Sequence, residues 1–291
     1  MNTPPEPDYA LKRAVLALLE AIREAARARG PVDTDRLDAR DPELIARVLP
    51  LMRSANRHYL RLRREGFESL PEGPVLYVGN HSGGIAGPDL CCTLGTLWEK
   101  RGPEAPFYAL AHDFAMRQLK PFGAFVQRFG AIRASPDNAR RALESGAQVL
   151  VYPGGEIDAN RHSRRRDEVI LGKRTGFVRV AQAARVPIVP IVAHGAHRSA
   201  YVFSEGETIV RLLALKRWAR VERFPLAFAL PWGLAFGPWL PYLPLPFPIQ
   251  LRVLPPIEAP PGEAPEAIRD HVQAAMQSAL TDMARQARSN P

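Results

Sequence analysis

Residues 79–89, GNHSGGIAGPD, bring together two side chains suited to proton transfer, because His81 is followed eight positions later by Asp89. Histidine accepts and returns a proton near neutral pH more readily than any other side chain. A carboxylate on its second ring nitrogen fixes the tautomer and stabilises the cation that forms. Gly83, Gly84 and Gly87 leave the backbone free to reverse between the two side chains. The stretch therefore favours a histidine base oriented by an aspartate.

A purely structural role fits the same spacing. In that alternative, His81 binds backbone groups of a turn and Asp89 caps the following helix. A phosphate-binding glycine loop has less support, since neither G-x-G-x-x-G nor a Walker motif is present. No G-x-S-x-G nucleophile elbow accompanies the pair. If the pair is catalytic, we expect it to activate the substrate's own hydroxyl without a covalent intermediate.

A second stretch, YPGGEIDANRHSRRR at 152–166, combines glycines at a strand end with acidic and arginine residues. Glycines there let backbone N–H groups approach an anion, and arginine presents forked donors that match phosphate oxygens. The alternative is a solvated surface loop. The run carries neither interleaved aromatic residues nor a nucleic-acid-binding motif, so nucleic acid is not an expected partner.

A third stretch contains H-x-x-H at His194 and His197. With His81, His112 and Asp89 these histidines could suggest zinc. However, the motif follows a predicted strand and lacks the H-E-x-x-H pattern of a helix, so no metal is expected.

Composition narrows the class of protein. The chain has 291 residues, a formal net charge of +9 and 46% hydrophobic residues. Such a basic chain meets nucleic acid, anionic lipid or phosphorylated substrates. Its two cysteines, Cys91 and Cys92, are adjacent and cannot form a disulfide framework. The N-terminal residues show no signal-peptide pattern, and we expect a cytoplasmic protein.

One segment, 224–251, has no charged side chain and seven prolines. The prolines exclude a continuous helix, and no transmembrane helix is expected. The segment is interpreted either as a buried connection with a core strand or as a membrane-docking surface. For the second interpretation the candidate side chains are Trp232, Phe236, Trp239 and Tyr242, because aromatic side chains suit the lipid interface.

The elements that position these residues alternate between strands and helices. The expected strands are 74–80, 105–112, 131–135, 147–153, 187–195 and 249–257. The expected helices are 8–29, 41–59, 89–102, 136–146, 175–186 and 265–288. This order predicts an α/β fold with a central, largely parallel or mixed sheet flanked by helices. We expect an N-terminal helical extension at 1–55, a catalytic domain at 56–260 and a C-terminal amphipathic helix at 261–291 that packs on it.

Taken together, the ordered blocks resemble the lysophospholipid acyltransferase superfamily, also called PlsC-like or glycerolipid acyltransferases. The likeness is carried by VGNHSGGIAGPD, FGAFVQRFGAIRASPDNARRALESGAQVLVYPGGE and GKRTGFVRVAQAARVPIVPIVAHG. The family's usual N-H-x4-D is N-H-x7-D here, as in a bacterial N-H-S-G-G subgroup related to diacylglycerol acyltransferase-like proteins. YPGGE stands where F-P-E-G-T-R is common, with Arg161 the nearest substitute for the arginine. A neutral acceptor therefore stays open beside lysophosphatidic acid.

The resemblance implies that His81 is the general base on the acceptor hydroxyl and that Asp89 orients it. The residues it implies for substrate binding are Asn80, Ser82, Gly83, Gly84, Arg128, Arg133, Gly154, Gly155, Glu156 and Arg161. The implied activity is transfer of a fatty acyl group from acyl-CoA or acyl carrier protein to a glycerolipid or lysophospholipid hydroxyl, with no cofactor. The implied location is the inner face of the cell membrane, as a peripheral protein on anionic lipid. The alternatives are a non-glycerolipid hydroxyl acceptor, a non-catalytic lipid-binding protein and a metal-dependent hydrolase.

Overall fold

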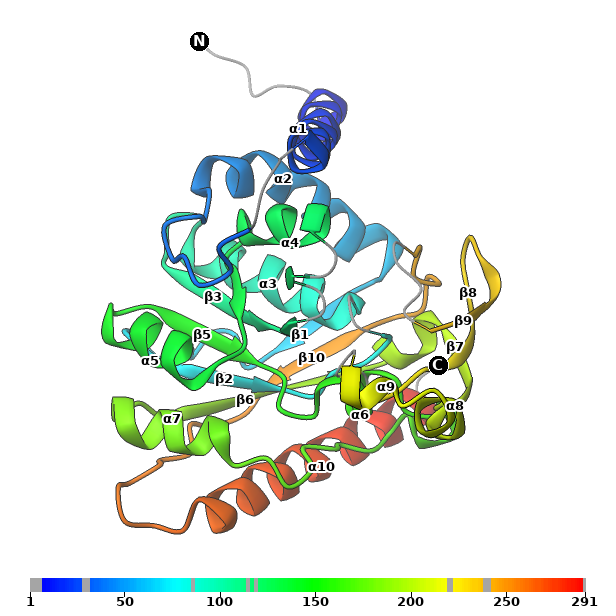
Figure 1. The fold of residues 1–291 in the computed structure, drawn as a ribbon. Helices are drawn as coiled ribbons and strands as arrows, with labels where there is room; N and C mark the ends of the chain where they lie inside the picture. The colour runs from blue at the N-terminus through cyan, green and yellow to red at the C-terminus, as the bar shows by residue number, and fades with distance from the viewer. Residues whose placement is uncertain are drawn as a thin grey trace.

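The computed structural model describes residues 7–27, 32–84, 87–113, 116–117, 120–218, 222–237 and 242–289. At its centre is a seven-stranded sheet of order β1-β10-β6-β2-β5-β3-β4 (Figure 1). Its strands are β1 (Arg63–Glu65), β2 (Leu76–Gly79), β3 (Phe107–Ala111), β4 (Ala131–Arg133), β5 (Gln148–Val151), β6 (Ile188–His194) and β10 (Gln250–Val253). Strands β2 to β6 are mutually parallel, whereas β10 pairs antiparallel with β6 and β1 runs parallel to β10. The predicted α/β fold with a mostly parallel sheet is confirmed.

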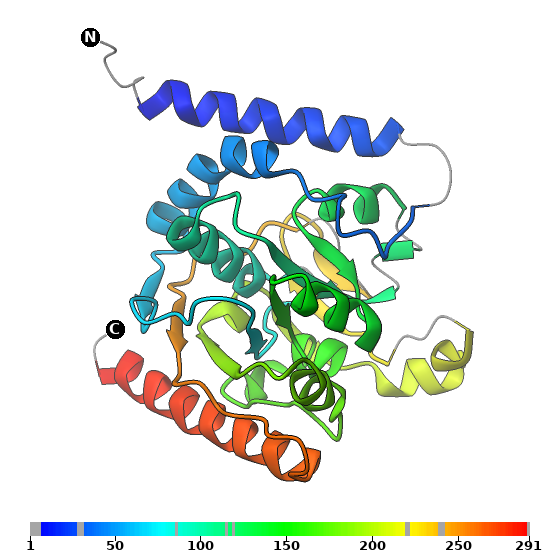
Figure 2. The ribbon, with the colours of Figure 1, turned by 90° about the vertical axis from the view of Figure 1, so that its left-hand side faces the viewer.

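Helices cover both faces of this sheet (Figures 1 and 2). One face carries α2 (Pro42–Ser54) and α3 (Pro88–Arg101), and the other carries α5 (Pro136–Glu144), α7 (Gly176–Ala184) and α10 (Pro265–Ser289). Outside the first layer, α1 (Pro7–Arg27) packs on α2 and on α4 (Lys120–Gln127). The shorter helices are η1 (Ala55–Tyr59), α6 (Gly155–Ala159), η3 (Ser163–Arg165), η4 (Ala196–Ser199), α8 (Glu207–Leu212) and α9 (Leu215–Trp218).

Strand alternation divides the core into two clusters. In β2, Leu76 and Val78 face α5, α7 and α10, whereas Tyr77 faces α2 and α3. All three residues are at most 1% exposed. A parallel strand covered on both faces needs apolar residues at successive positions, which explains the run PVLYV that leads to His81.

Local sequence signals fix where several helices begin. Asp41 caps α2 by accepting a hydrogen bond from Leu44 N at 2.9 Å, and Ser135 caps α5 by accepting one from Asn138 N at 3.2 Å. Proline occupies the first turn of α2, α3 and α5. These signals explain why the sequence located the first residue of each of these helices to within one residue, whereas α2 ends at Ser54, before the predicted end at 59, and the π-helical turn η1 follows it. The end of the first predicted helix, 28–29, lies outside the described residues.

A second, three-stranded sheet of order β7-β8-β9 lies at one side of the molecule and was not predicted (Figure 1). Its strands are β7 (Tyr201–Ser204), β8 (Leu226–Ala229) and β9 (Gly233–Phe236). Strands β8 and β9 fall in the uncharged segment 224–251, which therefore contains an antiparallel hairpin rather than only a connection and a late strand. The prolines obscured this hairpin, because they flank the two short strands and interrupt the sequence pattern.

The two terminal helices pack differently. Helix α10 places Ile268, Val272 and Met276 in the main core, all at most 2% exposed. Helix α1 packs through Ala17 and Ala21, while Leu16 on its outer side is 59% exposed. Among the described helices, none has an apolar stretch long enough to cross a bilayer.

Candidate active site

The three stretches singled out in the sequence meet at one edge of the large sheet. His81 follows β2, the YPGG turn follows β5, and His194 is the last residue of β6. Because these strands are parallel neighbours, their carboxyl ends lie side by side. In open α/β sheets, this edge is where sites form.

His81 and Asp89 form a buried, hydrogen-bonded pair. His81 Nδ1 lies 2.9 Å from Asp89 Oδ2, and Ser82 N donates to the same oxygen at 2.9 Å. The Asp89 side chain is fully buried and that of His81 is 10% exposed. An ionised Asp89 requires a proton on Nδ1, so proton exchange with a substrate falls to Nε2.

Helix α3 explains why Asp89 reaches the histidine. Gly87 is the N-cap of α3 and Pro88 is its first residue, so Asp89 lies inside the first turn. The positive end of the helix dipole favours a carboxylate at this position. Asp89 therefore binds His81 and Ser82. It is not the N-cap of α3, as it would be if the stretch were only a capped turn.

The YPGG turn supports the imidazole from one side. The rings of Tyr152 and His81 are stacked, with centroids 4.6 Å apart and planes 29° apart. A Cβ on Gly79 would lie 2.3 Å from the Tyr152 ring, so glycine at the end of β2 makes room for this contact. Burial holds the pKa of the Tyr152 hydroxyl well above its usual range, so the ring is neutral. Tyr152 thus limits how the His81 ring can tilt.

The turn after His81 depends on its glycines. Gly83 and Gly84 have φ values of +83° and +90°, a region that side chains disfavour. A Cβ on Gly83 would also lie 2.5 Å from Ser199 Oγ. Gly84 N donates to Ala159 O at 3.0 Å. The glycines therefore allow a tight reversal that is tied to the segment after β5.

Comparison with known proteins agrees with this geometry. The Acyltransferase family model matches residues 61–194, a range that includes both His81 and the YPGG turn. The fold matches the crystal structure of the 1-acyl-sn-glycerophosphate (LPA) acyltransferase PlsC from Thermotoga maritima, with a TM-score of 0.54 and 14% identity. That match covers 95% of this chain and 94% of the PlsC chain. The chain is therefore similar to the acyltransferase family over the residues that carry the candidate site, and it shares the fold of PlsC.

Several curated proteins are also similar to this chain. An uncharacterized protein of Mycobacterium tuberculosis is 26% identical over 78% of this chain and 64% of its own length. Phytyl ester synthase 2 of Arabidopsis thaliana is 33% identical over 42% of this chain and 18% of its own length. The DGAT1/2-independent enzyme synthesizing storage lipids of Bos taurus is 27% identical over 58% of this chain and 46% of its own length. The chain thus spans less than two thirds of the length of these relatives.

Asn80 and Ser82, both predicted to bind substrate, have their polar side chains directed into the protein. Asn80 Nδ2 donates to Ala193 O at 3.0 Å, and Asn80 Oδ1 accepts from Ala193 N at 2.8 Å. This exchange extends the pairing of β2 with β6 to the residue before His81. Ser82 Oγ accepts a hydrogen bond from Arg161 Nη2 at 2.9 Å. In this structure both residues orient the turn at residues 81–84, here called the catalytic turn for the role that is proposed below.

Gly154, Gly155 and Glu156 form the start of α6. A Cβ on Gly154 would lie 2.1 Å from Ile170 O, and Gly155 has a φ of +52°. Glu156 is 8% exposed, and its Oε2 accepts from Glu222 N at 2.8 Å. Glycine at 154 therefore permits close backbone approach, and Glu156 anchors the chain that leads into β8.

Arg128 and Arg133 are bound by acidic side chains of the N-terminal residues. Arg128 Nη2 lies 2.7 Å from Asp41 Oδ2, and Arg128 Nη1 contacts Glu24. Arg133 forms a two-pronged contact with Asp35, with Nε–Oδ1 and Nη2–Oδ2 distances of 2.7 and 2.9 Å. This contact holds the pKa of Asp35 down at about 2. Arg128, which follows α4, and Arg133 in β4 therefore tie these two elements to α1 and to the segment that leads into α2.

Arg161, the predicted substitute for the family's arginine, is fully buried beside the catalytic turn. It forms an ion pair with Asp158, which sequence reasoning had not assigned to the site. Asp158 Oδ2 accepts from His81 N at 2.6 Å. Burial raises the pKa of Asp158 to about 6 against the opposing effect of the Arg161 charge. The only signal for Asp158 in the sequence was its place in YPGGEID.

His197 and Tyr242 also contact the turn and were not predicted to belong to the site. His197 Nδ1 accepts from Gly83 N at 3.4 Å, and His197 Nε2 lies 2.9 Å from Arg161 O. Burial lowers the pKa of His197 to about 3, so this ring is neutral. The Tyr242 hydroxyl donates to Gly83 O. His194, the other histidine of H-x-x-H, lies 3.8 Å from Asp167 Oδ1, so the two histidines have separate partners.

Proposed function

We propose that the protein transfers a fatty acyl group from acyl-CoA or acyl carrier protein to the hydroxyl of a lipid acceptor. The observation that carries this proposal is the His81–Asp89 pair at the sheet edge, with Nδ1 and Oδ2 2.9 Å apart. His81 Nε2 takes the acceptor's hydroxyl proton while the oxygen attacks the thioester carbonyl carbon. The tetrahedral intermediate then expels the thiolate, which receives the proton from the imidazolium. Asp89 keeps Nδ1 protonated and stabilises the cation.

The test of this reaction measures two products together. Purified protein is given acyl-CoA carrying a labelled acyl group, with and without an acceptor, and both free thiol and labelled ester are quantified. Acyl carrier protein loaded with the same acyl group forms a second arm. Thiol release that matches ester formation and requires the acceptor is the expected result. Thiol release without ester would identify a hydrolase, and the absence of both with every donor and acceptor would favour a lipid-binding protein.

For the acceptor, we propose a neutral glyceride or a long-chain alcohol. The three arginines considered for an acceptor phosphate are all engaged by the protein: Arg128 by Asp41, Arg133 by Asp35 and Arg161 by Asp158. Two relatives are named for phytyl esters and for storage lipids. A panel of diacylglycerol, phytol-like alcohol, a sterol and lysophosphatidic acid tests this choice. Faster turnover of lysophosphatidic acid than of any neutral acceptor would contradict it.

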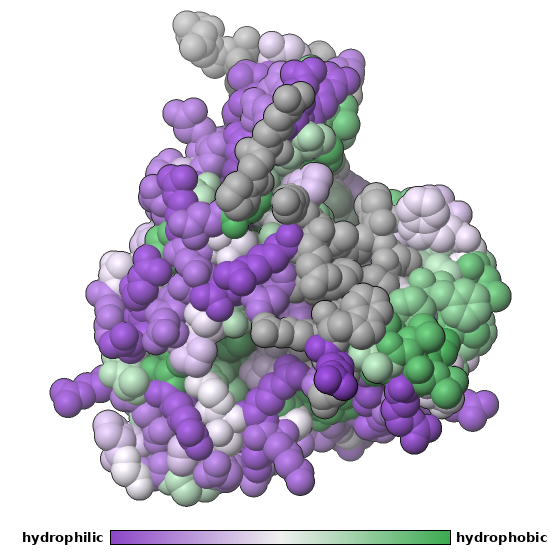
Figure 3. All heavy atoms as spheres, viewed as in Figure 1, coloured by the Kyte–Doolittle hydropathy of each residue, from purple (hydrophilic) through white to green (hydrophobic). Residues whose placement is uncertain are grey.

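We further propose that the protein works as a peripheral protein on the inner face of the cell membrane, through the β7–β9 sheet. This sheet directs large apolar side chains outward and small ones inward. In β8, Phe228 is 40% exposed while its neighbours Ala227 and Ala229 are fully buried. Leu234 and Phe236 in β9 are 60% and 61% exposed. Figure 3 shows the resulting apolar patch on the side where β7–β9 lie.

Strand register gathers these side chains into rows. Tyr201 of β7 pairs with Phe228, and Phe228 pairs with Leu234, so three exposed apolar side chains lie in line across the sheet. Exposed apolar patches of this kind on a soluble fold mark an interaction surface. Trp232, at the hairpin turn, is 54% exposed. Trp239, which belonged to the predicted docking surface, lies outside the described residues.

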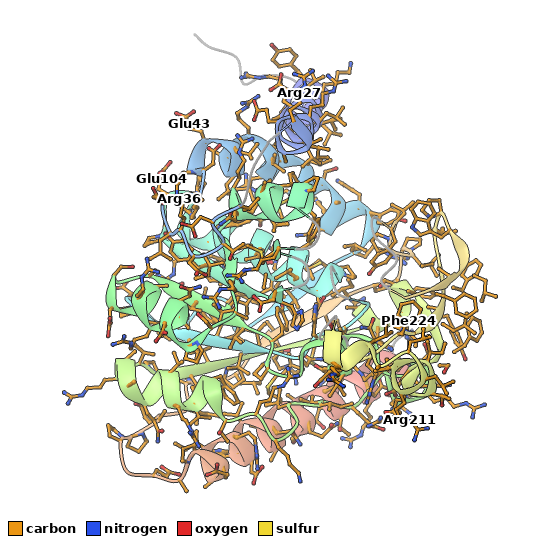
Figure 4. The ribbon with its side chains drawn as sticks, viewed as in Figure 1. Arg27, Arg36, Glu43, Glu104, Arg211 and Phe224 are labelled. Atoms are coloured by element: carbon orange, nitrogen blue, oxygen red, sulfur yellow. The ribbon has the colours of Figure 1, made fainter. Side chains whose placement is uncertain are left out.

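We propose that anionic lipid covers the apolar patch of the β7–β9 sheet. Arg211 and Arg217 are exposed residues of α8 and α9, which follow β7 in the chain, and Figure 4 shows Arg211 on that side of the molecule. Aromatic side chains bordered by arginines suit the boundary between headgroups and acyl chains. The fourth predicted docking residue, Tyr242, is partly buried and reaches Gly83 instead. Through it the docking sheet is joined to the catalytic turn, so a lipid acceptor would lie near the site.

Vesicle sedimentation tests the docking surface. We expect wild-type protein to sediment with vesicles that contain phosphatidylglycerol, and a Leu234→Asp, Phe236→Asp variant to stay in solution. Arg211→Gln should weaken binding to these vesicles but leave the molecular mass in solution unchanged. A matched control is Leu254→Ser, a partly buried residue of the main core. Equal sedimentation of all variants would contradict the proposal, and a dimer that dissociates on Phe236→Asp would assign the patch to a second copy.

A further inference from the structure

The backbone of the catalytic histidine is held by one buried ion pair. Asp158 and Arg161 are both 0% exposed, and Arg161 Nη1 lies 2.9 Å from Asp158 Oδ1. His81 donates its backbone N–H to Asp158 Oδ2 at 2.6 Å. The carbonyl oxygen of His81 accepts from Arg161 Nη1 at 2.7 Å. The two members of one pair therefore satisfy both backbone polar groups of His81.

The remaining donors of Arg161 fix its guanidinium between two segments. Nη2 donates to Ser82 Oγ at 2.9 Å on the side of the catalytic turn. On the other side, Nε donates to Arg165 O at 3.0 Å and Nη2 to Arg166 O at 2.9 Å. Every nitrogen of the guanidinium thus has a protein acceptor. A group held in this way fixes the turn and does not contact a ligand.

Asp158 is fixed in the same manner. Its Oδ1 accepts from Ile170 N at 3.2 Å as well as from Arg161. The carbonyl oxygen of Arg161 in turn contacts His197 Nε2 at 2.9 Å, and His197 accepts from Gly83 N. Residues 81–83 are therefore bound along their length by groups that follow β5 and β6.

A buried ion pair is a costly way to stabilise a fold, because desolvation of two charges offsets their attraction. This pair directs its contacts at the residue that must be held accurately for proton transfer. Misplacement of a catalytic group by about 1 Å can lower a rate about 100-fold. We propose that Asp158 and Arg161 are positioning residues, which hold the His81 backbone so that its ring stays between Asp89 and the acceptor hydroxyl. The inference rests on the proposed function.

Arg161, the nearest counterpart of the family's arginine, lies in the protein interior. Arg161 then cannot bind an acceptor phosphate without releasing the catalytic turn. Arg161 therefore acts on the position of the base and not on the choice of acceptor. Substitution of Arg161 should lower the turnover of every acceptor by a similar factor.

The test separates positioning from stability. Asp158→Asn, Arg161→Lys and Arg161→Met are compared with wild-type protein for kcat, for KM of acyl-CoA and acceptor, and for melting temperature. Arg252→Lys is the control, because Arg252 forms an ion pair with Glu65 at 2.7 Å on strands away from the turn. We expect kcat of Asp158→Asn and Arg161→Met to fall about 10- to 100-fold with both KM values within about twofold. Arg161→Lys should retain more of kcat than Arg161→Met, because lysine keeps the charge.

Two results would overturn the proposal. One is a kcat per folded molecule that is unchanged in all three variants while melting temperature falls, as in the control. The other is a raised KM for the acceptor with unchanged kcat, which would place Arg161 in acceptor binding. If the charge-removing variants do not fold, Ser82→Ala removes one acceptor of Arg161 at the turn, and its kcat must fall for the proposal to stand. Wild-type turnover that requires His81 supports the proposed function whichever way these variants behave.

Discussion

Two regions of the molecule depart from the usual burial of apolar side chains and exposure of charged ones. Charged side chains are buried around the catalytic turn, whereas apolar side chains are exposed on the β7–β9 sheet. In the turn, Asp89, Asp158 and Arg161 are charged side chains with no exposed surface. In the sheet, Leu234 and Phe236 are apolar side chains with about 60% of their surface exposed. Buried charges destabilise a fold unless they are paired, and exposed apolar patches favour association. Each region therefore departs from the most stable arrangement at a place where we propose a function, the reaction in one case and lipid docking in the other.

The difference between the two regions lies in what completes them. At the turn, the charges of Asp158 and Arg161 are bound by backbone groups and by each other. The outer face of the sheet leaves large apolar side chains exposed, and we propose that anionic lipid covers them. Changes in the turn should therefore alter chemistry and stability, whereas changes on the sheet should alter association alone.

The largest effect is expected for Asp89→Asn, which breaks the catalytic pair without changing its size. An asparagine amide donates to Nδ1, so the imidazole proton moves to Nε2 and the ring can no longer accept the acceptor's proton. We expect the rate of acyl transfer to fall about 10²- to 10⁴-fold. The measurement is the initial rate with saturating donor and acceptor. A rate within threefold of wild type would show that Asp89 does not set the tautomer.

A second prediction uses the pH dependence of stability in the turn. His197 has an ordinary pKa of 6.5 when unfolded and about 3 when folded. As pH falls below 6.5 the unfolded chain binds a proton that the folded chain does not, so stability is lost. We expect His197→Asn to lose less stability than wild type between pH 6.5 and pH 4, by at most about 1.4 kcal/mol per pH unit. Urea unfolding at several pH values measures this.

Asp158 provides the opposing control in the same experiment. Its pKa is raised from 3.8 to about 6 on folding, so between these values the folded chain holds a proton that the unfolded chain has lost. Acidification from pH 6 to pH 4 therefore adds stability through Asp158. The Asp158→Asn variant should lose more stability on acidification than wild type does. Identical pH profiles for the two variants would contradict the assignment of these groups to the buried turn.

The smallest effect on folding is expected on the outer face of the sheet. Phe236→Ser should change the free energy of unfolding by less than about 0.5 kcal/mol, because the side chain is already 61% exposed. Val202→Ser on the inner face, at 1% exposure, should cost about 1–3 kcal/mol. Thermal unfolding of the two variants compares the faces directly. A cost for Phe236→Ser that equals that of Val202→Ser would show that the outer face is packed in the free protein.

Much of the fold followed from the sequence because local signals and periodicity agreed. Asp41, Ser135 and the prolines in first helical turns located three helices, and the apolar runs located the buried strands. The β7–β9 sheet could not be found in this way. Its strands have four residues each, and their large apolar side chains face outward. In a core strand such side chains mark the buried face, whereas in this sheet they mark the exposed one.

In the site, the sequence predicted the His81–Asp89 contact and the meeting of the turns after β2 and β5. It did not predict which groups hold the histidine. The side chains that hold the turn are distant from it in the sequence. Asp158 is 77 residues from His81, His197 is 114 residues from Gly83, and Tyr242 is 159 residues from Gly83. No spacing rule specifies contacts of that separation. Arg161 was selected as the nearest substitute for the family's arginine, and the sequence does not reveal that its side chain is buried.

The central claim is that His81 is the base for acyl transfer, and one comparison tests it most directly. Labelled ester formation from acyl-CoA and a neutral acceptor is measured for wild type, His81→Ala and His271→Ala, the last being an exposed histidine on α10. We predict that His81→Ala loses at least about 100-fold in rate while its melting temperature and vesicle binding stay near wild type, and that His271→Ala is unchanged. Ester formation by folded His81→Ala at the wild-type rate would contradict the account.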